Sequence, residues 1–398
     1  MKRVAIDINS VVPYYLQGWT TGIGRTTMEL VWALDRMEHL PVEIVLYSQN
    51  MKGIGAHNMH SHFATRHLYL PHRDRWNRVL SHTPVRQWLT GCDLYHIPHN
   101  FDYVHSPEKV IITLHDCIYF AYPEKKYNHA FARNYFPQLA NSCRGILTCS
   151  EASKRDIMKY MGVPENKIAV IPWGYNSDVF FHRQDWNTEM FDKETASLLG
   201  KIFSHDSYES LEDKTTLGDF AQTRRFFLCT SCNAERKNTP NLMRAYAQFA
   251  KQDPSHDLVL VWHDPNVEAR EVIRQHHLAH RIHFLSDLSD KEMAILYNLA
   301  TALFFPSRYE GFGLPVLESM ACGTPVVTCS NSSLSEVGGN VALYVDPDDI
   351  EGMSGLMEQF ENGSLSKINY TERCLRQAAH FSWQRCAEQT VDFYLKNL

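Results

Sequence analysis

The sequence has no run of about 18 consecutive apolar residues, which is the least that a membrane-spanning helix needs. Its first residues, MKRVAIDINSVV, reach Pro13 too early for the apolar core of a signal peptide. Internal repeats and low-complexity tracts are also absent. From these absences we expect a globular, cytoplasmic protein.

An excess of positive charge is missing too. The chain of 398 residues has 39 Lys and Arg against 45 Asp and Glu, a formal net charge of −6. This balance gives no electrostatic basis for binding nucleic acid. Any phosphate group that the protein binds must therefore be held by a local cluster of residues.

The ten cysteines and 21 histidines do not show the spacing of a metal site. Cys229 and Cys232 form a CxxC motif, but no second pair follows at zinc-ribbon spacing. His96 and His99 lack the i, i+4 spacing of a helical metal pair. We therefore expect reduced core thiols, with no metal and no cofactor.

Short apolar runs alternate with amphipathic stretches along most of the chain, which predicts parallel sheets with crossover helices. Six strands are predicted in each half, so we expect an α/β protein with two doubly wound domains. The predicted strands begin at Arg3, Val42, Asp93, Val110, Gly145 and Lys167 in the first half, and at Arg224, Asp257, Arg281, Ala302, Pro325 and Ala342 in the second.

The boundaries of the domains follow from composition. We expect an N-terminal domain over 1–176 and a C-terminal domain over 224–380. Residues 177–223 are polar but include KETASLLGKIF, which has helical spacing, so they are interpreted as a linker with a small helical insertion. Residues 381–398 form a last amphipathic helix that must pack against a domain.

In open α/β sheets ligands bind beyond the carboxyl ends of the strands. Arg236 and Lys237 follow a predicted strand and precede a helix, so two cations and a helix N-terminus would meet at one spot suited to a diphosphate. The alternative is a solvated pair of surface cations.

A second candidate is the turn SRYEGFGLP. It follows a buried strand and carries Glu310, and Glu318 lies on the helix after it. The glycines bring backbone N–H groups near a ligand, and the carboxylates can accept hydrogen bonds from sugar or ribose hydroxyls. A pair of glutamates can also serve as catalytic acid and base.

Two further candidates lie in the first half. Gly22, Ile23 and Gly24 precede a helix, where backbone N–H groups can approach an anion, or where glycine merely starts the helix. A dinucleotide site is rejected, because Thr27 stands where GxGxxG requires glycine. His115 follows a buried strand directly, either as a ligand-binding residue or as a structural histidine.

Glu310 and Glu318, with Gly-Phe-Gly-Leu-Pro between them, resemble the E-x7-E motif of family-4 retaining glycosyltransferases. The segments GIGR, LHD, VPENKIAVIPWG, ERKN, FLSDLSDKEMAILYNLA, ACGTPVV and FSWQRCAEQT occur in the order usual for that family. Three positions depart from the pattern: Ser231 and Ser286 replace glycines, and Glu235 stands where proline is usual. The resemblance implies the GT-B fold, two Rossmann-like domains facing across a cleft.

The resemblance also implies roles for individual residues. Arg236 and Lys237 would bind the diphosphate of a nucleotide-sugar donor, and Glu318 its ribose. His115 would reach the donor sugar, and the last helix would return to the first domain. The resemblance also implies that the N-terminal domain binds the acceptor and that the C-terminal domain binds the nucleotide-sugar donor. Other donor contacts would come from Gly22, Ile23, Gly24, Leu288, Glu310, Gly311, Phe312, Gly313 and Leu314.

The expected chemistry is departure of a nucleoside diphosphate from the anomeric carbon as an acceptor hydroxyl attacks. Cations and helix N-termini can stabilise the leaving phosphate without a metal. The sequence DPDD at 346–349 matches a metal-binding DxD, but it leads a helix, where capping explains it. His115, Glu310, Arg236 and Lys237 are the predicted catalytic residues, and the metal site is predicted to be absent.

We therefore expect a retaining hexosyltransferase of polysaccharide or glycolipid assembly, with mannose among the sugars that similar proteins use and a glycan or lipid-linked saccharide as acceptor. The alternatives are a sugar-nucleotide epimerase, a phosphorylase, or a non-catalytic sugar-nucleotide or glycan-binding scaffold.

One stretch bears on the acceptor. Pro71 to Leu89 interleaves four arginines with Trp76 and Trp88. Such a stretch can rest on an anionic membrane and meet a lipid-linked sugar. The alternative is an ordinary pair of surface helices with buried tryptophans.

Overall fold

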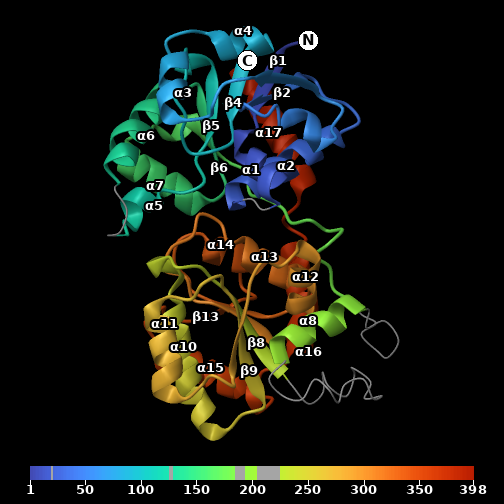
Figure 1. Ribbon diagram of the computed structural model, residues 1–398, viewed down its shortest axis with the longest axis vertical. Helices are drawn as coiled ribbons and strands as arrows, with labels where there is room; N and C mark the ends of the chain where they lie inside the picture. Colours follow the sequence, from blue (N-terminus) through green and yellow to red (C-terminus); the bar gives the residue numbers. More distant parts are fainter. Residues whose placement is uncertain (19–20, 125–128, 184–192, 204–224) are drawn as a thin grey trace. The chain divides into compact units, whose positions relative to one another are not determined.

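The computed structural model describes residues 1–18, 21–124, 129–183, 193–203 and 225–398. It contains two compact units (Figure 1). Unit 1 consists of Met1–Gly174 and Phe381–Leu398, and unit 2 of Tyr175–His380. Each unit is built on one fully parallel sheet, as the alternation of apolar runs and amphipathic stretches predicts.

The sheet of unit 1 has seven strands in the order β3-β2-β1-β4-β5-β6-β7. The prediction of six strands in this half was therefore wrong by one strand, β3. The strands are β1 (Arg3–Asp7), β2 (Glu43–Gln49), β3 (Ala64–Leu68), β4 (Leu94–Ile97), β5 (Val110–Thr113), β6 (Gly145–Thr148) and β7 (Ile168–Val170).

Residues alternate between the two faces of the sheet along each strand. Because both faces carry apolar residues, helices cover both of them. Val4 and Ile6 of β1 belong to the core that α2 and α17 share, whereas Ala5 belongs to the core under α6 and α7. The helices are α1 (Val12–Gln17), α2 (Gly22–Asp35), α3 (Asp74–Leu80), α4 (Val85–Thr90), α5 (Ile118–Ala121), α6 (Ala130–Ser142), α7 (Glu151–Met161) and α17 (Trp383–Asn397).

The last helix, α17, belongs to unit 1 although it follows unit 2 in the chain. The Ser382 hydroxyl caps its N-terminus by accepting a hydrogen bond from the Arg385 N–H. Its apolar face, with Trp383, Val391 and Tyr394, packs beside α2 (Figure 1).

The sheet of unit 2 has the six strands predicted, in the order β10-β9-β8-β11-β12-β13. They are β8 (Arg225–Thr230), β9 (His256–Val261), β10 (Ile282–Leu285), β11 (Ala302–Phe305), β12 (Val326–Thr328) and β13 (Leu343–Tyr344). The continuous burial of β11 is typical of a central strand in a parallel sheet.

In Figure 1, α10, α11 and α15 lie together on one side of the second sheet. The helices of unit 2 are α8 (Lys193–Phe203), α10 (Thr239–Phe249), α11 (Val267–His276), α12 (Asp290–Leu299), α13 (Leu314–Ala321), α14 (Leu334–Gly338), α15 (Ile350–Glu361) and α16 (Lys367–Ala378). Short 3-10 helices are η1 (Asn9–Val11), η2 (Ala56–Met59), η3 (Pro107–Lys109), η4 (Glu165–Lys167), η6 (Glu235–Lys237) and η7 (Ala250–Gln252).

The stretch interpreted as a linker, 177–223, lies partly outside the described residues. Within the described part, the helix predicted from KETASLLGKIF is α8, which contacts β10 and α12 of unit 2. Leu198 and Ile202 of α8 are buried. The segment before it also packs on unit 2, because the Phe180 ring is buried against the Tyr297 ring.

Candidate active site

In both sheets the strand order reverses beside the first strand of the unit, and ligands of doubly wound proteins bind at that point. In unit 2 the reversal lies between β8 and β11, which are neighbours in the sheet. Arg236 and Lys237 follow β8, and Glu310 follows β11. The sequence therefore places the predicted diphosphate-binding and sugar-binding residues at the carboxyl ends of adjacent strands.

The structure brings these three side chains together on one oxygen. The Glu310 Oε1 atom lies 2.7 Å from Arg236 Nη1, 2.8 Å from Lys237 Nζ and 2.6 Å from Ser307 Oγ. The three charged side chains are only 13% to 20% exposed. The site is therefore a half-buried cluster of two cations and one carboxylate.

The electrostatics of the cluster favour the ionised carboxylate. Burial raises the pKa of Glu310, but the Lys237 ammonium and the Arg236 guanidinium lower it by more, so the pKa lies below its ordinary value. The cluster then carries a net charge of +1, in a setting where water screens it poorly. Such a spot attracts an anion such as a diphosphate.

The backbone ties the two loops of the cluster to each other. The Arg308 N–H donates to the Arg236 carbonyl over 2.7 Å, and the Ser307 hydroxyl donates to the same carbonyl over 3.1 Å. The Lys237 ammonium lies 4.6 Å from the centroid of the Phe305 ring. These contacts fix the cations in place before any ligand binds.

The turn between Glu310 and α13 needs glycine at one position. Gly313 has φ of 119° and ψ of 49°, which a residue with a Cβ adopts only with strain. An added Cβ would also meet Leu334 Cδ2 at 3.0 Å. Ser333 Oγ supports the turn, at 2.8 Å from the Glu310 carbonyl and 2.7 Å from the Phe312 carbonyl. Pro315 then starts α13.

Glu318 lies on α13 and is 4% exposed. Its Oε2 atom accepts a hydrogen bond of 3.2 Å from the Tyr297 hydroxyl of α12. Leu288 is half-buried and lies between β10 and α12. Glu318 is thus held by a helix neighbour, whereas Glu310 is held by the cations.

The residues predicted from the first half lie in unit 1. The His115 ring is 4% exposed, and its Nε2 atom lies 3.0 Å from the Pro98 carbonyl. Burial lowers its pKa to about 4, so the ring is neutral at pH 7. It lines a cavity of about 30 Å³, enough for a water molecule.

Gly22 and Gly24 lie in the first turn of α2, where the Thr21 hydroxyl accepts a hydrogen bond of 3.2 Å from the Gly24 N–H. Apart from its chain neighbours and the backbone of its own helix, no atom of the described residues lies within 4 Å of where a Cβ of Gly22 would stand. Glycine therefore keeps this helix start open, and it is not required by a positive φ.

Sequence reasoning missed several residues of the site. Ser307, Ser333 and Tyr297 hold the two glutamates, yet none belongs to a charged motif. The signals for Ser307 were its position two residues after β11 and at the start of the turn SRYEGFGLP, since polar residues at a strand exit are candidates for a site.

The remaining motifs have structural explanations. Asp349 caps α15 by accepting a hydrogen bond of 2.7 Å from the Gly352 N–H, and Asp348 pairs with Arg308. This confirms that an aspartate of DPDD caps the helix, whereas Pro347 lies before the cap and not at the first helical position. Cys229 is buried and Cys232 is exposed, and all ten cysteines are free. Ser231, at one departure from the family pattern, hydrogen-bonds the Thr239 hydroxyl.

Two family models match the chain. The model described as Glycosyltransferase Family 4 matches residues 20–179, and the model described as Glycosyl transferases group 1 matches residues 218–380. Together they cover most of both units.

Relatives and solved structures give the same result. The chain is 28% identical over 309 residues to O-antigen chain mannosyltransferase B of Escherichia coli, covering 76% of this chain and 74% of that protein. It is 26% identical over 262 residues to O-antigen chain mannosyltransferase RfbU of Salmonella typhimurium. That match covers 65% of this chain and 63% of RfbU, which is less than two thirds of its length.

Among solved structures, Anabaena Alr3699/HepE in complex with UDP and glucose has a TM-score of 0.68 and 16% identity, with full coverage of both chains. At this identity the match shows the fold alone, which is GT-B. No helix within the described ranges combines the length and apolar composition needed to cross a membrane. The sheets, the strand-exit residues and the two family models agree that this chain belongs to the family 4, group 1 glycosyltransferases.

Proposed function

We propose that the protein is a retaining hexosyltransferase that moves mannose from a nucleoside-diphosphate sugar to a glycan or lipid-linked acceptor in surface polysaccharide assembly. The observation that carries the proposal is the cluster of Arg236, Lys237 and Glu310 at the switch point of unit 2. The names of the two O-antigen mannosyltransferases support mannose as the sugar. The UDP in the Anabaena structure supports a nucleotide donor.

The mechanism follows from charge. As the bond between the anomeric carbon and the phosphate breaks, negative charge grows on the leaving diphosphate. Arg236 and Lys237 stabilise that charge, and they do so without reorganisation because Glu310 and the backbone already hold them. Glu310 contacts both cations and Ser307 through Oε1, so its other carboxylate oxygen can accept a hydrogen bond from a hydroxyl of the donor sugar.

Glu318 takes the ribose in this proposal, and Leu288 lies against the base. His115 contacts the donor sugar. The backbone from Gly311 to Leu314 lies along that sugar, and Gly22 to Gly24 lie along the phosphate or the acceptor. We assign no residue of the cluster as a covalent nucleophile. The acceptor hydroxyl therefore attacks from the face that the diphosphate leaves. The departing diphosphate takes the proton of that hydroxyl. The configuration of the product, read by NMR, tests this step, because an inverted product would contradict it.

A panel of GDP-, UDP-, ADP- and dTDP-sugars in a thermal-shift assay tests donor binding. A donor at about 100 times its Kd adds ~2.7 kcal/mol to the free energy of unfolding. We expect GDP-mannose to raise the Tm most. The rise should shrink in Glu318→Gln, which keeps the side-chain volume, and persist in Glu351→Gln, a glutamate of α15.

The results of this panel distinguish the proposed transferase from its alternatives. If no donor raises the Tm, the non-catalytic scaffold becomes the better account. If donors bind but the product is a rearranged nucleotide sugar without transfer, an epimerase on the same fold becomes the better account.

We also propose that α3 and α4 rest on an anionic membrane. Trp76 is 41% exposed, Val79 57% and Trp88 75%, so the alternative of buried tryptophans does not hold. Arg73, Arg75 and Arg78 are exposed, and within the described ranges their guanidinium groups make no ion pair. An exposed set of aromatic and basic side chains is suited to the interface of an anionic bilayer.

A further inference from the structure

Three neighbouring strands of unit 2 end in a row beside the charged cluster. Arg236 and Lys237 follow β8, Glu310 follows β11, and the loop 329–333 follows β12, in the sheet order β8-β11-β12. Neighbouring strands are about 4.8 Å apart, so the ends of β8 and β12 are roughly 10 Å apart. In the proposed function the hexose at Glu310 therefore lies between the cations and the loop after β12.

This loop is fastened to the turn that carries Glu310. The Glu310 N–H donates a hydrogen bond of 3.1 Å to Ser332 Oγ. The Ser333 hydroxyl donates to the Glu310 carbonyl over 2.8 Å. Asn331 precedes these two serines, so its Cα lies ~3.8 Å along the chain from that of a residue in contact with Glu310.

The backbone of the loop is strained at Ser332. Its φ of 47° lies in the left-handed region, which a residue with a Cβ other than Asn or Asp seldom adopts. Residues in such conformations cost free energy and are concentrated at ligand sites. The two serine hydrogen bonds to the Glu310 turn hold this conformation, and with it the position of Asn331.

The side chain of Asn331 lacks a partner. Its Oδ1 atom is buried and makes no hydrogen bond to any residue that the structure describes. The Asn331 backbone is held, because its carbonyl accepts a hydrogen bond of 3.3 Å from the Leu334 N–H at the start of α14. Helix α14 in turn packs beside α13, which follows Glu310 (Figure 1). The unpaired atom is thus a buried acceptor on a fixed loop, which costs free energy until a donor reaches it.

The chemistry of an amide selects the kind of ligand. Because Oδ1 is an acceptor, a phosphate oxygen cannot satisfy it, whereas a hydroxyl can donate to it. The amide nitrogen of the same side chain donates, so a second hydroxyl can accept from it. Two hydroxyls on neighbouring carbons of a sugar ring offer this pair of groups.

We infer that Asn331 binds the hydroxyls at C3 and C4 of the donor hexose, on the side of the ring away from the diphosphate, and that it thereby selects the sugar. The inference rests on the proposed function, because it assigns a further contact to the same donor. Glu310 would contact the ring from the end of β11 and Asn331 from the end of β12. An epimer with the C4 hydroxyl turned to the other face loses one hydrogen bond to the amide.

Titration calorimetry with GDP-mannose and with GDP tests the contact. Asn331→Leu removes the amide and keeps a side chain of similar shape. We expect a Kd for GDP-mannose about tenfold weaker than in the wild-type protein and an unchanged Kd for GDP, which has no hexose. The Tm of the ligand-free variant should not fall, because the oxygen removed has no protein partner.

Two further variants guard the interpretation. Asn331→Ala removes the amide without adding a branched side chain and should give the same result. Ser330→Ala, at an exposed serine of the same loop, is the control and should bind both ligands like the wild-type protein. The preference for GDP-mannose over its C4 epimer, GDP-talose, should shrink in both Asn331 variants and persist in Ser330→Ala.

Weaker binding of GDP-mannose with unchanged binding of GDP supports the inference. An unchanged Kd for GDP-mannose in the Asn331 variants overturns it. An equal loss for GDP, with a lower Tm, also overturns it, because this result assigns Asn331 a structural role. An unchanged preference over GDP-talose contradicts the selection of the sugar. Failure of the wild-type protein to bind either GDP or GDP-mannose counts against the proposed function, and the inference falls with it.

Discussion

His115 illustrates how a predicted site residue acquires its properties from burial. Its backbone N–H donates to the Asn100 side chain, and its ring lies 5.1 Å from the Trp173 ring, both in unit 1. The sequence predicts where this residue lies, directly after β5, but its exposure depends on segments far along the chain. Its neutral ring can act on a ligand only through hydrogen bonds.

The pKa of His115 predicts a pH dependence of stability. In the unfolded chain the pKa is near 6.5, and in the folded protein it is about 4. Between these values the unfolded state binds a proton that the folded state does not, so the free energy of unfolding falls as the pH falls from 6.5 toward 4. When the pH is lowered from 7 to 5, the free energy of unfolding of His115→Gln should therefore fall by about 2 kcal/mol less than that of the wild-type protein.

Urea titrations at the two pH values measure the free energy of unfolding of each protein. The change between the two pH values is compared between variant and wild type, because the substitution also shifts the absolute stability. His276→Gln, at an exposed histidine of α11, serves as the control and should follow wild type. An identical pH dependence in His115→Gln and wild type would show that this ring is protonated as readily in the folded protein as in the unfolded chain.

Single residues also mark the limit of sequence-based prediction. Arg236, Lys237 and Glu310 could be predicted because charged residues at strand exits are uncommon without a ligand or a partner. The pairing of Arg86 with Asp102 could not, since the two lie on different elements and only the folded chain brings their side chains to 2.7 Å. A sequence shows the charge of an arginine and does not show whether it is buried.

At the scale of elements, the predicted strands are those with continuous apolar runs. Such runs arise because a parallel strand is covered on both faces. β3, with the sequence ATRHL, lacks this signal because it lies at the edge of the sheet and its residues are exposed or half-buried. The pairing of its residues with those of β2 is set when the sheet forms, and the sequence of β3 alone does not predict it.

The helices α3 and α4 give a prediction at this scale. Vesicles of phosphatidylcholine with phosphatidylglycerol should sediment the protein, and neutral vesicles should not, because arginines next to an anionic surface each contribute about 1 kcal/mol. Replacing Arg73, Arg75 and Arg78 with Gln should reduce binding by roughly 100-fold. Added salt should weaken wild-type binding in the same way.

The matched control replaces three exposed cations of unit 2, Lys251, Arg270 and Arg274, with Gln, and should bind like wild type. Equal loss in both triple variants would mean that net charge, and not the face of α3, governs binding. Equal sedimentation with neutral vesicles would contradict the electrostatic part of the proposal.

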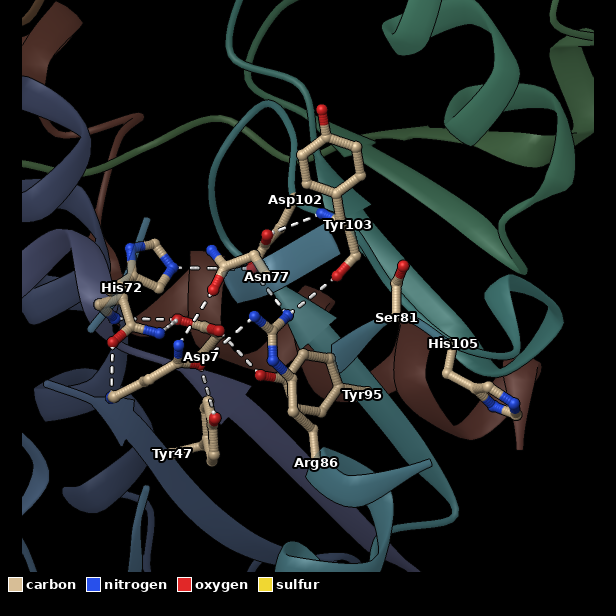
Figure 2. Close-up of polar contacts among 12 residues, drawn as sticks. Asp7, Tyr47, His72, Asn77, Ser81, Arg86, Tyr95, Asp102, Tyr103 and His105 are labelled. Carbon is tan, nitrogen blue, oxygen red and sulfur yellow. Dashed lines mark hydrogen bonds and ion pairs between the residues drawn. The ribbon is translucent and has the colours of Figure 1, made fainter. Parts of the chain in front are cut away.

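For the whole molecule, the two sheets share one design: the strand order reverses beside the first strand, and polar residues gather after the strands there. In unit 2 this point carries two cations beside one carboxylate, and in unit 1 it carries the ion pair of Arg86 with Asp102 (Figure 2) beside aromatic rings. The sequence predicts two doubly wound units because the apolar runs of the strands and the amphipathic pattern of the helices are both strong. It does not predict which residues come together after the strands of unit 1, because these residues lie on separate loops.

The central claim is that the cations after β8 bind the donor diphosphate, and titration calorimetry with GDP-mannose tests it most directly. Arg236→Ala should cost ~1.5 to 3 kcal/mol of binding free energy, roughly a 10- to 150-fold weaker Kd, because a charge-assisted hydrogen bond is lost. Arg308→Ala is the matched control, since this arginine lies in the neighbouring turn but pairs with Asp348. Wild-type affinity in Arg236→Ala, or an equal loss in Arg308→Ala, would contradict the account.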